Sequence, residues 1–140
     1  MNNAVTIVMI EDDQGHARLI EKNIVRAGVT NPIVHFPNGT TALEYLERNG
    51  DSAKSLLVLL DLNLPDMTGI DILQRLKSDE GLKRAPVIVL TTTDDKREIE
   101  RCYELGCNVY ITKPVDYDSF ANAIRQLGLF FSVIQVPESA

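Results

Sequence analysis

The chain has few cysteines, few basic residues and no long apolar run, and each shortage excludes a class of protein. Its two cysteines, Cys102 and Cys107, fit neither a metal site nor a disulfide framework in number or spacing. Lys and Arg number 14 against 20 Asp and Glu, and this net charge of −6 disfavours nonspecific nucleic-acid binding. No apolar stretch approaches the roughly 18 residues of a membrane span, and no basic region opens the chain as in a signal peptide. We therefore expect a cytoplasmic protein that binds neither membrane nor nucleic acid directly.

Apolar runs alternate with helical patterns along the chain. The runs, which predict strands, lie at 5–10, 33–36, 56–61, 86–91 and 109–112. The segments with helical periodicity lie at 13–27, 40–49, 70–79, 95–105 and 119–135. The candidate N-caps of the second, fourth and last helices are Thr40 or Thr41, Asp94 or Asp95, and Asp116 or Asp118. This alternation predicts one α/β domain, with helices on both faces of a parallel sheet.

Polar residues follow four of the predicted strands. Glu11 and Asp12 follow the first, Asp61 ends the third, Thr91 ends the fourth and Lys113 follows the last. The carboxyl ends of parallel strands meet at one edge of a sheet, where ligands bind, so these residues converge. Carboxylates packed together oppose one another's ionisation, and oxygen ligands with room for water suit Mg²⁺. The sequence therefore predicts a Mg²⁺ site, at which Mn²⁺ can substitute.

Each residue of this cluster has a chemical role to offer. The two aspartates can ligate the metal directly, and Glu11 can reach it directly or through a water. The backbone carbonyl of Asn63, two residues beyond Asp61, is a further candidate ligand. Asp61 is the candidate nucleophile, because carboxylates form aspartyl-phosphates. Lys113 can pair with a phosphoryl oxygen, and Thr91 can donate a hydrogen bond to another.

Three residues near this edge allow more than one interpretation. Tyr110, on the last strand, can swing between an inward and an outward position, although such a tyrosine is commonly plain core or edge. Pro114 gives the preceding peptide bond access to the cis form, which would re-aim Lys113 into the site. His16, at the start of the first helix, can donate to a phosphoryl oxygen or a partner, or can be solvated.

The C-terminal segment carries more apolar surface than one small sheet needs as cover. A helix over 119–135 would be about 26 Å long. Exposed apolar patches mark interfaces, so we expect residues 128–140 to continue the helix of a 1–127 domain into a homodimer. The expected interface residues are Tyr110, Phe120, Ile124, Leu127, Phe130, Phe131 and Ile134. The alternative is a tail that folds back on its own domain.

Over residues 4–127 the chain resembles the receiver domain of two-component response regulators. The resemblance rests on the Glu11-Asp12 pair, LVLLDLNLPDMTG at 57–69, PVIVLTT at 86–92 and YITKP at 110–114. It implies a flavodoxin-like, doubly wound sheet of five parallel strands in the order 2-1-3-4-5. It also implies that a phosphohistidine on a sensor histidine kinase is the phosphoryl donor.

The same resemblance assigns roles to particular residues. Asp61 is the implied phosphoacceptor, which holds Mg²⁺ together with the acidic pair. The implied phosphoryl contacts are Thr91, Thr92 and Lys113. Thr91 and Tyr110 are the implied switch, and the Lys113–Pro114 bond is implied to be cis.

A narrower resemblance is to the single-domain regulators paired with bacterial phytochromes. It rests on TTTDD at 91–95, YELGCNVYITKPVDYDSF at 103–120 and an apolar tail ending in Val-Pro. It implies a phytochrome as the kinase, and dimers formed through the last strand, the last helix and the C-terminal extension. Two positions depart from the common receiver pattern. Glu11 replaces the commoner Asp, and Thr92, where small residues are usual, can crowd the site and change the dephosphorylation rate.

Two other functions compete with this interpretation. A phosphatase with an aspartate nucleophile would carry its acid catalyst at position 63, but Asn63 cannot donate a proton in that role. A docking module that has lost phosphorylation is opposed by the intact Asp12, Asp61, Thr91 and Lys113. With no output domain expected after residue 127, the protein would not be an enzyme beyond its own phosphorylation and dephosphorylation. Its signal would pass through a protein partner, a phosphorelay or the dimer.

Overall fold

Five strands and five helices alternate in the computed structural model, which describes residues 5–49, 55–114 and 116–131, without the side chains of Tyr117 and 128–131. The strands are β1 (Val5–Ile10), β2 (Ile33–Phe36), β3 (Ser55–Leu60), β4 (Val87–Thr91) and β5 (Val109–Thr112). The helices are α1 (Gln14–Arg26), α2 (Gly39–Asn49), α3 (Gly69–Ser78), α4 (Lys96–Leu105) and α5 (Tyr117–Phe131). Every strand and helix predicted from the sequence is therefore present, although residues 132–135 of the last predicted helix lie outside the described residues.

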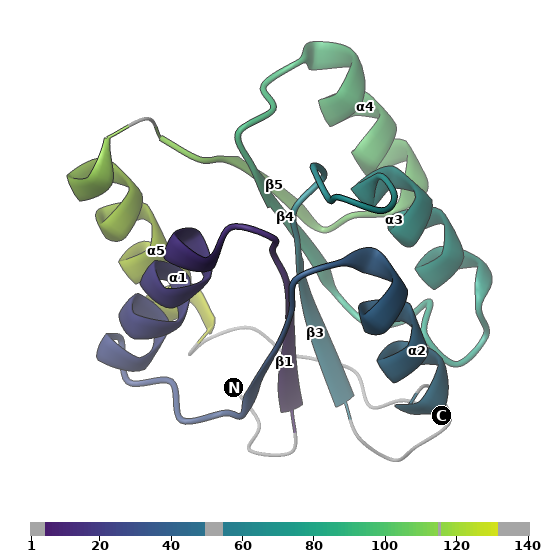
Figure 1. Ribbon diagram of the computed structural model, residues 1–140, viewed down its shortest axis with the longest axis horizontal. Helices are drawn as coiled ribbons and strands as arrows, with labels where there is room; N and C mark the ends of the chain where they lie inside the picture. The colour runs from purple at the N-terminus through teal and green to yellow at the C-terminus, as the bar shows by residue number, and fades with distance from the viewer. Residues whose placement is uncertain (1–4, 50–54, 115, 132–140) are drawn as a thin grey trace.

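The strands form one parallel sheet in the order β2-β1-β3-β4-β5 (Figure 1). This confirms the doubly wound, flavodoxin-like arrangement. From β1 the chain first adds β2 on one side and then returns to add β3 on the other. The strand order therefore reverses between β1 and β3, and the carboxyl ends of these two strands flank a crevice suited to a ligand.

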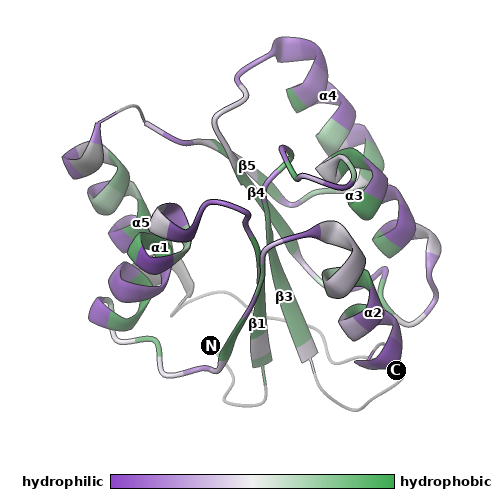
Figure 2. Ribbon diagram, in the orientation of Figure 1, coloured by the Kyte–Doolittle hydropathy of each residue, from purple (hydrophilic) through white to green (hydrophobic). Residues whose placement is uncertain are grey.

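Two apolar clusters, one on each face of the sheet, form the core. All six residues of β1 and all six of β3 are buried, as expected for central strands covered on both faces. One cluster joins the sheet to α2, α3 and α4 and contains the fully buried Leu46 and Leu73. The other joins it to α1 and α5 through residues such as Ile20 and Ile124. The apolar sides of the helices face the sheet, and their hydrophilic sides face outward (Figure 2).

The helix caps correct one prediction and settle two. Neither Thr40 nor Thr41 caps α2, because Asn38 Oδ1 accepts the Thr41 N–H at 2.9 Å and α2 begins at Gly39. Asp95 caps α4 by accepting from the N–H groups of residues 97 and 98. Asp116 accepts the N–H of residue 119 at 2.8 Å, in the first turn of α5.

The last helix also requires a correction. Phe120, Ile124 and Leu127 are 4%, 1% and 5% exposed, because they pack on α1 and the sheet of their own chain. The prediction that these three residues form a subunit interface is therefore wrong, since helical spacing shows an apolar face but not what covers it. The side chains of Phe130 and Phe131, and the whole of Ile134, lie outside the described residues.

Among the described residues, the helices are too short or too polar to cross a membrane.

Candidate functional site

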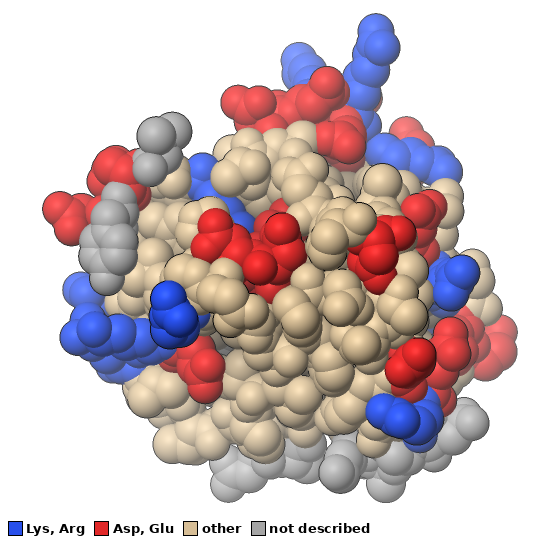
Figure 3. Space-filling view, viewed as in Figure 1, with Lys and Arg blue, Asp and Glu red and all other residues tan. Residues whose placement is uncertain are grey.

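Three carboxylates meet at the carboxyl edge of the sheet. Glu11 and Asp12 follow β1 and Asp61 follows β3, and oxygen atoms of all three lie within 4.8 Å of one another. Glu11 and Asp61 are only 2% and 6% exposed, whereas Asp12 faces solvent. Acidic side chains gather near the middle of the face in Figure 3, around the loop that follows β1. The predicted cluster is thus brought together by the topology, with two acids buried and one open.

Lys113 supplies the positive charge of this cluster. Its side chain is 1% exposed and forms ion pairs with Glu11 and, at 3.1 Å, with Asp61 Oδ2. It reaches them from the end of β5, where its backbone N–H donates to the Thr91 carbonyl at 2.7 Å. A buried lysine held between two buried acids is a charge arrangement that folding alone rarely favours.

Burial and neighbouring groups shift the pKa values of the two buried acids in opposite directions. Burial, reinforced by the neighbouring Asp61, raises the pKa of Glu11 to about 8, although Lys113 opposes this shift. Burial also opposes ionisation of Asp61. Hydrogen bonds with Glu11, the Asn63 N–H and Thr91, together with the Lys113 charge, nevertheless hold the Asp61 pKa below its ordinary value. Asp61 is therefore the carboxylate that stays ionised, as a nucleophile must.

The loop after β3 holds Asp61 in place. The N–H of Asn63 donates to Asp61 Oδ1 at 3.1 Å, and the Asn63 side-chain amide donates to Thr93 Oγ1 at 3.2 Å. Asn63 also forms an isolated antiparallel bridge with Thr68, and the Gly69 N–H closes the loop on the Leu62 carbonyl at 2.9 Å. The contact with Thr93 was not predicted from the sequence.

We expect Gly69→Ala to lower the free energy of unfolding by roughly 3 kcal/mol. A methyl group at Gly69 would lie 2.6 Å from the Asp61 carbonyl oxygen and 2.6 Å from the Leu62 Cα, so the backbone that carries Asp61 must shift. Gly39→Ala is the matched control, because both glycines begin a helix. Its methyl would meet Met67 Cγ at 2.5 Å and Met67 Sδ at 2.7 Å, but these atoms belong to a flexible side chain that can move without a shift of the backbone. Denaturant titration measures both losses, and an equal or larger loss for Gly39→Ala would contradict the prediction.

The two predicted switch residues lie beside the cluster. Thr91 is fully buried, and its Oγ1 accepts from the Asn63 amide at 3.4 Å. Tyr110 is half-buried and donates its hydroxyl proton to the Thr93 carbonyl at 2.6 Å. In this position the Tyr110 ring packs against the apolar core cluster on the face of the sheet covered by α2, α3 and α4.

A cavity of about 190 Å³ opens over the acidic cluster. Its lining contains Glu11, Asp12, Asp13, His16, Asp61, Asn63, Thr92 and Lys113. Thr92 is thus at the site, as predicted. Asp13 was not predicted as a site residue; it caps α1 by accepting the His16 N–H at 3.0 Å.

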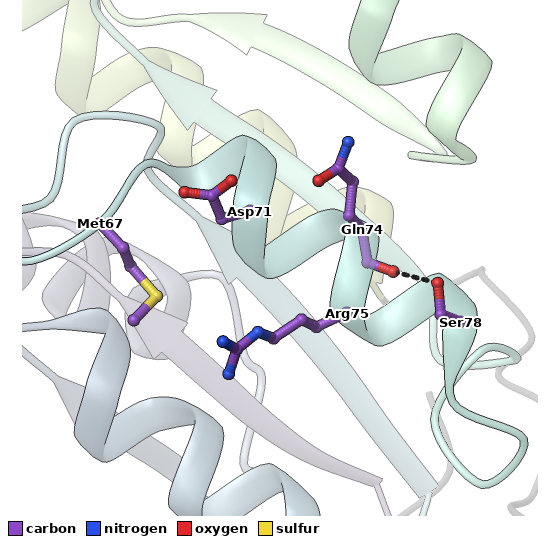
Figure 4. Close-up of a pocket in the computed structure, with 5 residues that line it drawn as sticks. All are labelled: Met67, Asp71, Gln74, Arg75 and Ser78. Atoms are coloured by element: carbon purple, nitrogen blue, oxygen red, sulfur yellow. Dashed lines mark hydrogen bonds between the residues drawn. The ribbon is translucent and has the colours of Figure 1, made fainter.

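A second hollow, of about 290 Å³, lies along α3 (Figure 4). Its lining residues are Met67, Asp71, Gln74, Arg75 and Ser78. None of them belongs to the acidic cluster or pairs with it. The smaller cavity, where charge is concentrated and buried, is therefore the candidate site.

The predicted cis bond before Pro114 is absent, because the described residues contain no cis peptide. The Lys113–Pro114 bond is trans, and Lys113 still reaches Asp61. Re-aiming of the lysine is not needed, and the trans form is the default even before proline.

Asp66 joins the Asp61 loop to α2 and was not identified from the sequence. Its carboxylate accepts the N–H groups of Gly39 and Thr40 at 2.9 and 2.8 Å. These hydrogen bonds, together with one from the Thr40 hydroxyl, lower the pKa of Asp66 to about 2. The acid thus stabilises the positive end of α2 and ties this helix to the loop.

The chain is similar to known proteins along most of its length. Residues 7–125 match the family model of the response regulator receiver domain. A response regulator receiver domain from Rhodospirillum rubrum is 67% identical, covers 96% of this chain and 98% of its own, and has a TM-score of 0.93.

Two cyanobacterial relatives are also similar. The phosphorylated phytochrome response regulator RcpA is 32% identical, with a TM-score of 0.86 over 94% of this chain and 97% of its own. The Mn²⁺-bound form of response regulator Rcp1 is 28% identical, with a TM-score of 0.87 over 94% and 98%. In sequence, Rcp1 of Synechocystis is 33% identical over 80% of this chain and 78% of its own length.

Proposed function

The chain belongs to the response regulator receiver family of two-component systems, and from this premise we propose that Asp61 accepts a phosphoryl group in a metal-dependent reaction. One observation carries the proposal. The Asp61 carboxylate is buried, lies 3.1 Å from the Lys113 ammonium, and borders two more acids in an open cavity. A nucleophile, a cation for the incoming charge and a metal-binding donor set are thus adjacent.

The residues present fit a divalent metal ion. Three carboxylates with oxygens within 4.8 Å of one another form an all-oxygen donor set, and the exposed Asp12 leaves room for water. We assign Glu11, Asp12, Asp61 and the backbone carbonyl of Asn63 to Mg²⁺. Mn²⁺ is an alternative, as in the Mn²⁺-bound form of Rcp1. Bound there, the ion would neutralise the acids and attract charge from phosphoryl oxygens.

The chain's own residues then perform the transfer. An Asp61 carboxylate oxygen attacks phosphorus, the P–N bond of a phosphohistidine breaks, and its electron pair returns to the imidazole nitrogen. Lys113 pairs with one phosphoryl oxygen, Thr91 donates its hydroxyl proton to another, and Thr92 borders the same group. Apart from the acyl phosphate formed on Asp61, the protein is unchanged.

The proposed donor is a sensor histidine kinase, since receiver domains partner with such kinases. The likeness to the phytochrome response regulator RcpA supports a phytochrome as that kinase. We propose no direct contact with nucleic acid.

The proposed output is a change in protein contacts. Phosphorylation would draw Thr91 inward and let Tyr110 leave its hydrogen bond to Thr93, altering the surface of α4, β5 and α5. Residues 1–127 would act as the receiver, and residues 128–140 would extend it into a homodimer. In that assembly Tyr110 would contribute from the receiver and Phe130, Phe131 and Ile134 from the extension.

Intact mass in the presence of Mg²⁺ and a small phosphoryl donor tests the proposal. Wild type should gain one phosphoryl group, Asp61→Asn should gain none, and chelation of Mg²⁺ should abolish the gain. Asp71→Asn is the matched control, because Asp71 is an exposed acid on α3 outside the cluster. The absence of any gain in wild type would contradict the proposal and leave a docking module.

An aspartate-nucleophile phosphatase is not favoured. Its acid catalyst would stand at position 63, where the amide of Asn63 donates to the hydroxyls of Thr91 and Thr93 instead.

A further inference from the structure

The Lys113 ammonium has three N–H donors and three acceptors around it. Two acceptors are the carboxylates of Glu11 and Asp61 already described. The third is His16 Nδ1, at 3.1 Å. An ammonium only donates, so this hydrogen bond requires Nδ1 to accept and the ring proton to lie on Nε2. The same Nδ1 lies 3.8 Å from Glu11 Oε1 and 3.8 Å from Asp13 Oδ2. Among the described residues, Lys113 is the only buried cation of the site, and His16 provides its third hydrogen-bond acceptor.

Of these three acceptors, only His16 has no other task in the proposed reaction. Metal binding engages Glu11 and Asp61, and phosphorylation engages Asp61 again. We infer that His16 is a positioning residue for Lys113, which holds the ammonium over Asp61 while the two acids turn to the metal and the phosphoryl group. This inference rests on the proposed function of Asp61.

The surroundings of His16 suit this role. Its ring centroid lies 5.1 Å from that of Phe120, and the Lys113 Nζ lies 5.9 Å from the Phe120 centroid. The ammonium is thus bracketed by an imidazole from α1 and a phenyl ring from α5. The Phe120 ring is buried and packs against one side of the imidazole. Both side chains limit the positions that the flexible lysine can adopt.

Loss of the histidine acceptor has two expected consequences. Without Nδ1, the ammonium directs its donors to Glu11 and Asp61, and so competes more strongly with a metal ion for the same carboxylates. It is also less well placed for a phosphoryl oxygen. We therefore expect both metal affinity and phosphorylation rate to fall, by about fivefold each, since water replaces part of the lost charge-assisted hydrogen bond.

Two substitutions distinguish the hydrogen-bond acceptor of His16 from the packing of its ring. His16→Phe keeps an aromatic ring against Phe120 but removes the acceptor. His16→Asn removes the ring but can place Oδ1 near the position of Nδ1. The measurements are Mn²⁺ affinity by electron paramagnetic resonance without any phosphoryl donor, and the initial phosphorylation rate with a small donor. The Lys113→Met background tests whether the effect passes through the lysine.

We expect both quantities to fall in His16→Phe, most of the loss to be recovered in His16→Asn, and His16→Phe to have no effect in the Lys113→Met background. Wild-type values for His16→Phe would overturn it. Equal losses in both variants would also overturn it, because they would show that ring packing matters rather than the acceptor. If wild type takes up no phosphoryl group, the proposed function fails, while the Mn²⁺ affinities still test the role of His16.

Discussion

Replacing Lys113 with methionine is expected to lower the free energy of unfolding of the metal-free protein by about 3 kcal/mol at pH 8. The ammonium is buried between Glu11 and Asp61, and its loss leaves the ionised Asp61 buried without a cation, beside an acid whose ionisation Lys113 favours. We also expect phosphoryl transfer to Asp61 to slow by roughly a hundredfold, because no other buried cation among the described residues faces that oxygen. Denaturant titration and the initial rate of phosphoryl uptake measure the two losses.

Mg²⁺ should separate these two losses. A bound cation can replace the missing positive charge, so much of the stability should return with the metal, whereas the lost phosphoryl contact should not. Lys77→Met is the control, because among the described residues the Lys77 ammonium donates to the carbonyls of Lys83 and Ala85, each at 3.1 Å, and to no carboxylate. The stability lost in Lys77→Met should be the same with and without Mg²⁺. If Lys113→Met were as stable as wild type without metal, Lys113 would not neutralise the cluster.

The topology and the acidic cluster were predictable from sequence for the same physical reason. Central strands of a doubly wound sheet are covered on both faces, so β1 and β3 consist of consecutive apolar residues that are recognisable without the structure. Once those strands are parallel, the residues that follow them must meet at one edge. The convergence of Glu11, Asp61 and Lys113 therefore follows from chain order alone.

Contacts that link distant segments were not predictable in this way. Asp66 stabilises the start of α2 at Gly39, which is 27 positions away, and no local pattern indicates such a pair. Helical spacing identified the apolar face of α5, but α1 rather than a partner covers Phe120. The sequence permits a cis bond before Pro114, but only the structure shows that the trans bond already brings Lys113 to its acids.

Glu11→Gln is expected to remove most of the loss of stability that metal-free wild type suffers as the pH rises. Burial raises the pKa of Glu11 from 4.5 to about 8 in the folded protein. The folded state therefore binds this proton more tightly than the unfolded state, and its contribution is complete below pH 4.5 and lost as the pH rises through 8. Between pH 4.5 and 8, the free energy of unfolding of wild type should fall by on the order of 4 kcal/mol more than that of Glu11→Gln. Equal pH slopes for the two proteins in chelator would contradict the assignment.

Metal binding should be coupled to the same proton. A divalent ion favours the ionised acid, so at pH 6–7 wild type must release about one proton for each metal ion bound. Calorimetric titration in buffers of different ionisation enthalpy measures that proton directly, and Glu11→Gln should release none from this site. Excess Mg²⁺ should also flatten the pH dependence of wild-type stability, because the bound metal takes the place of the proton. On the proposed function, we therefore expect the proton of Glu11 and the ammonium of Lys113 to stabilise the site without metal, and both to give way to the ion before Asp61 is phosphorylated.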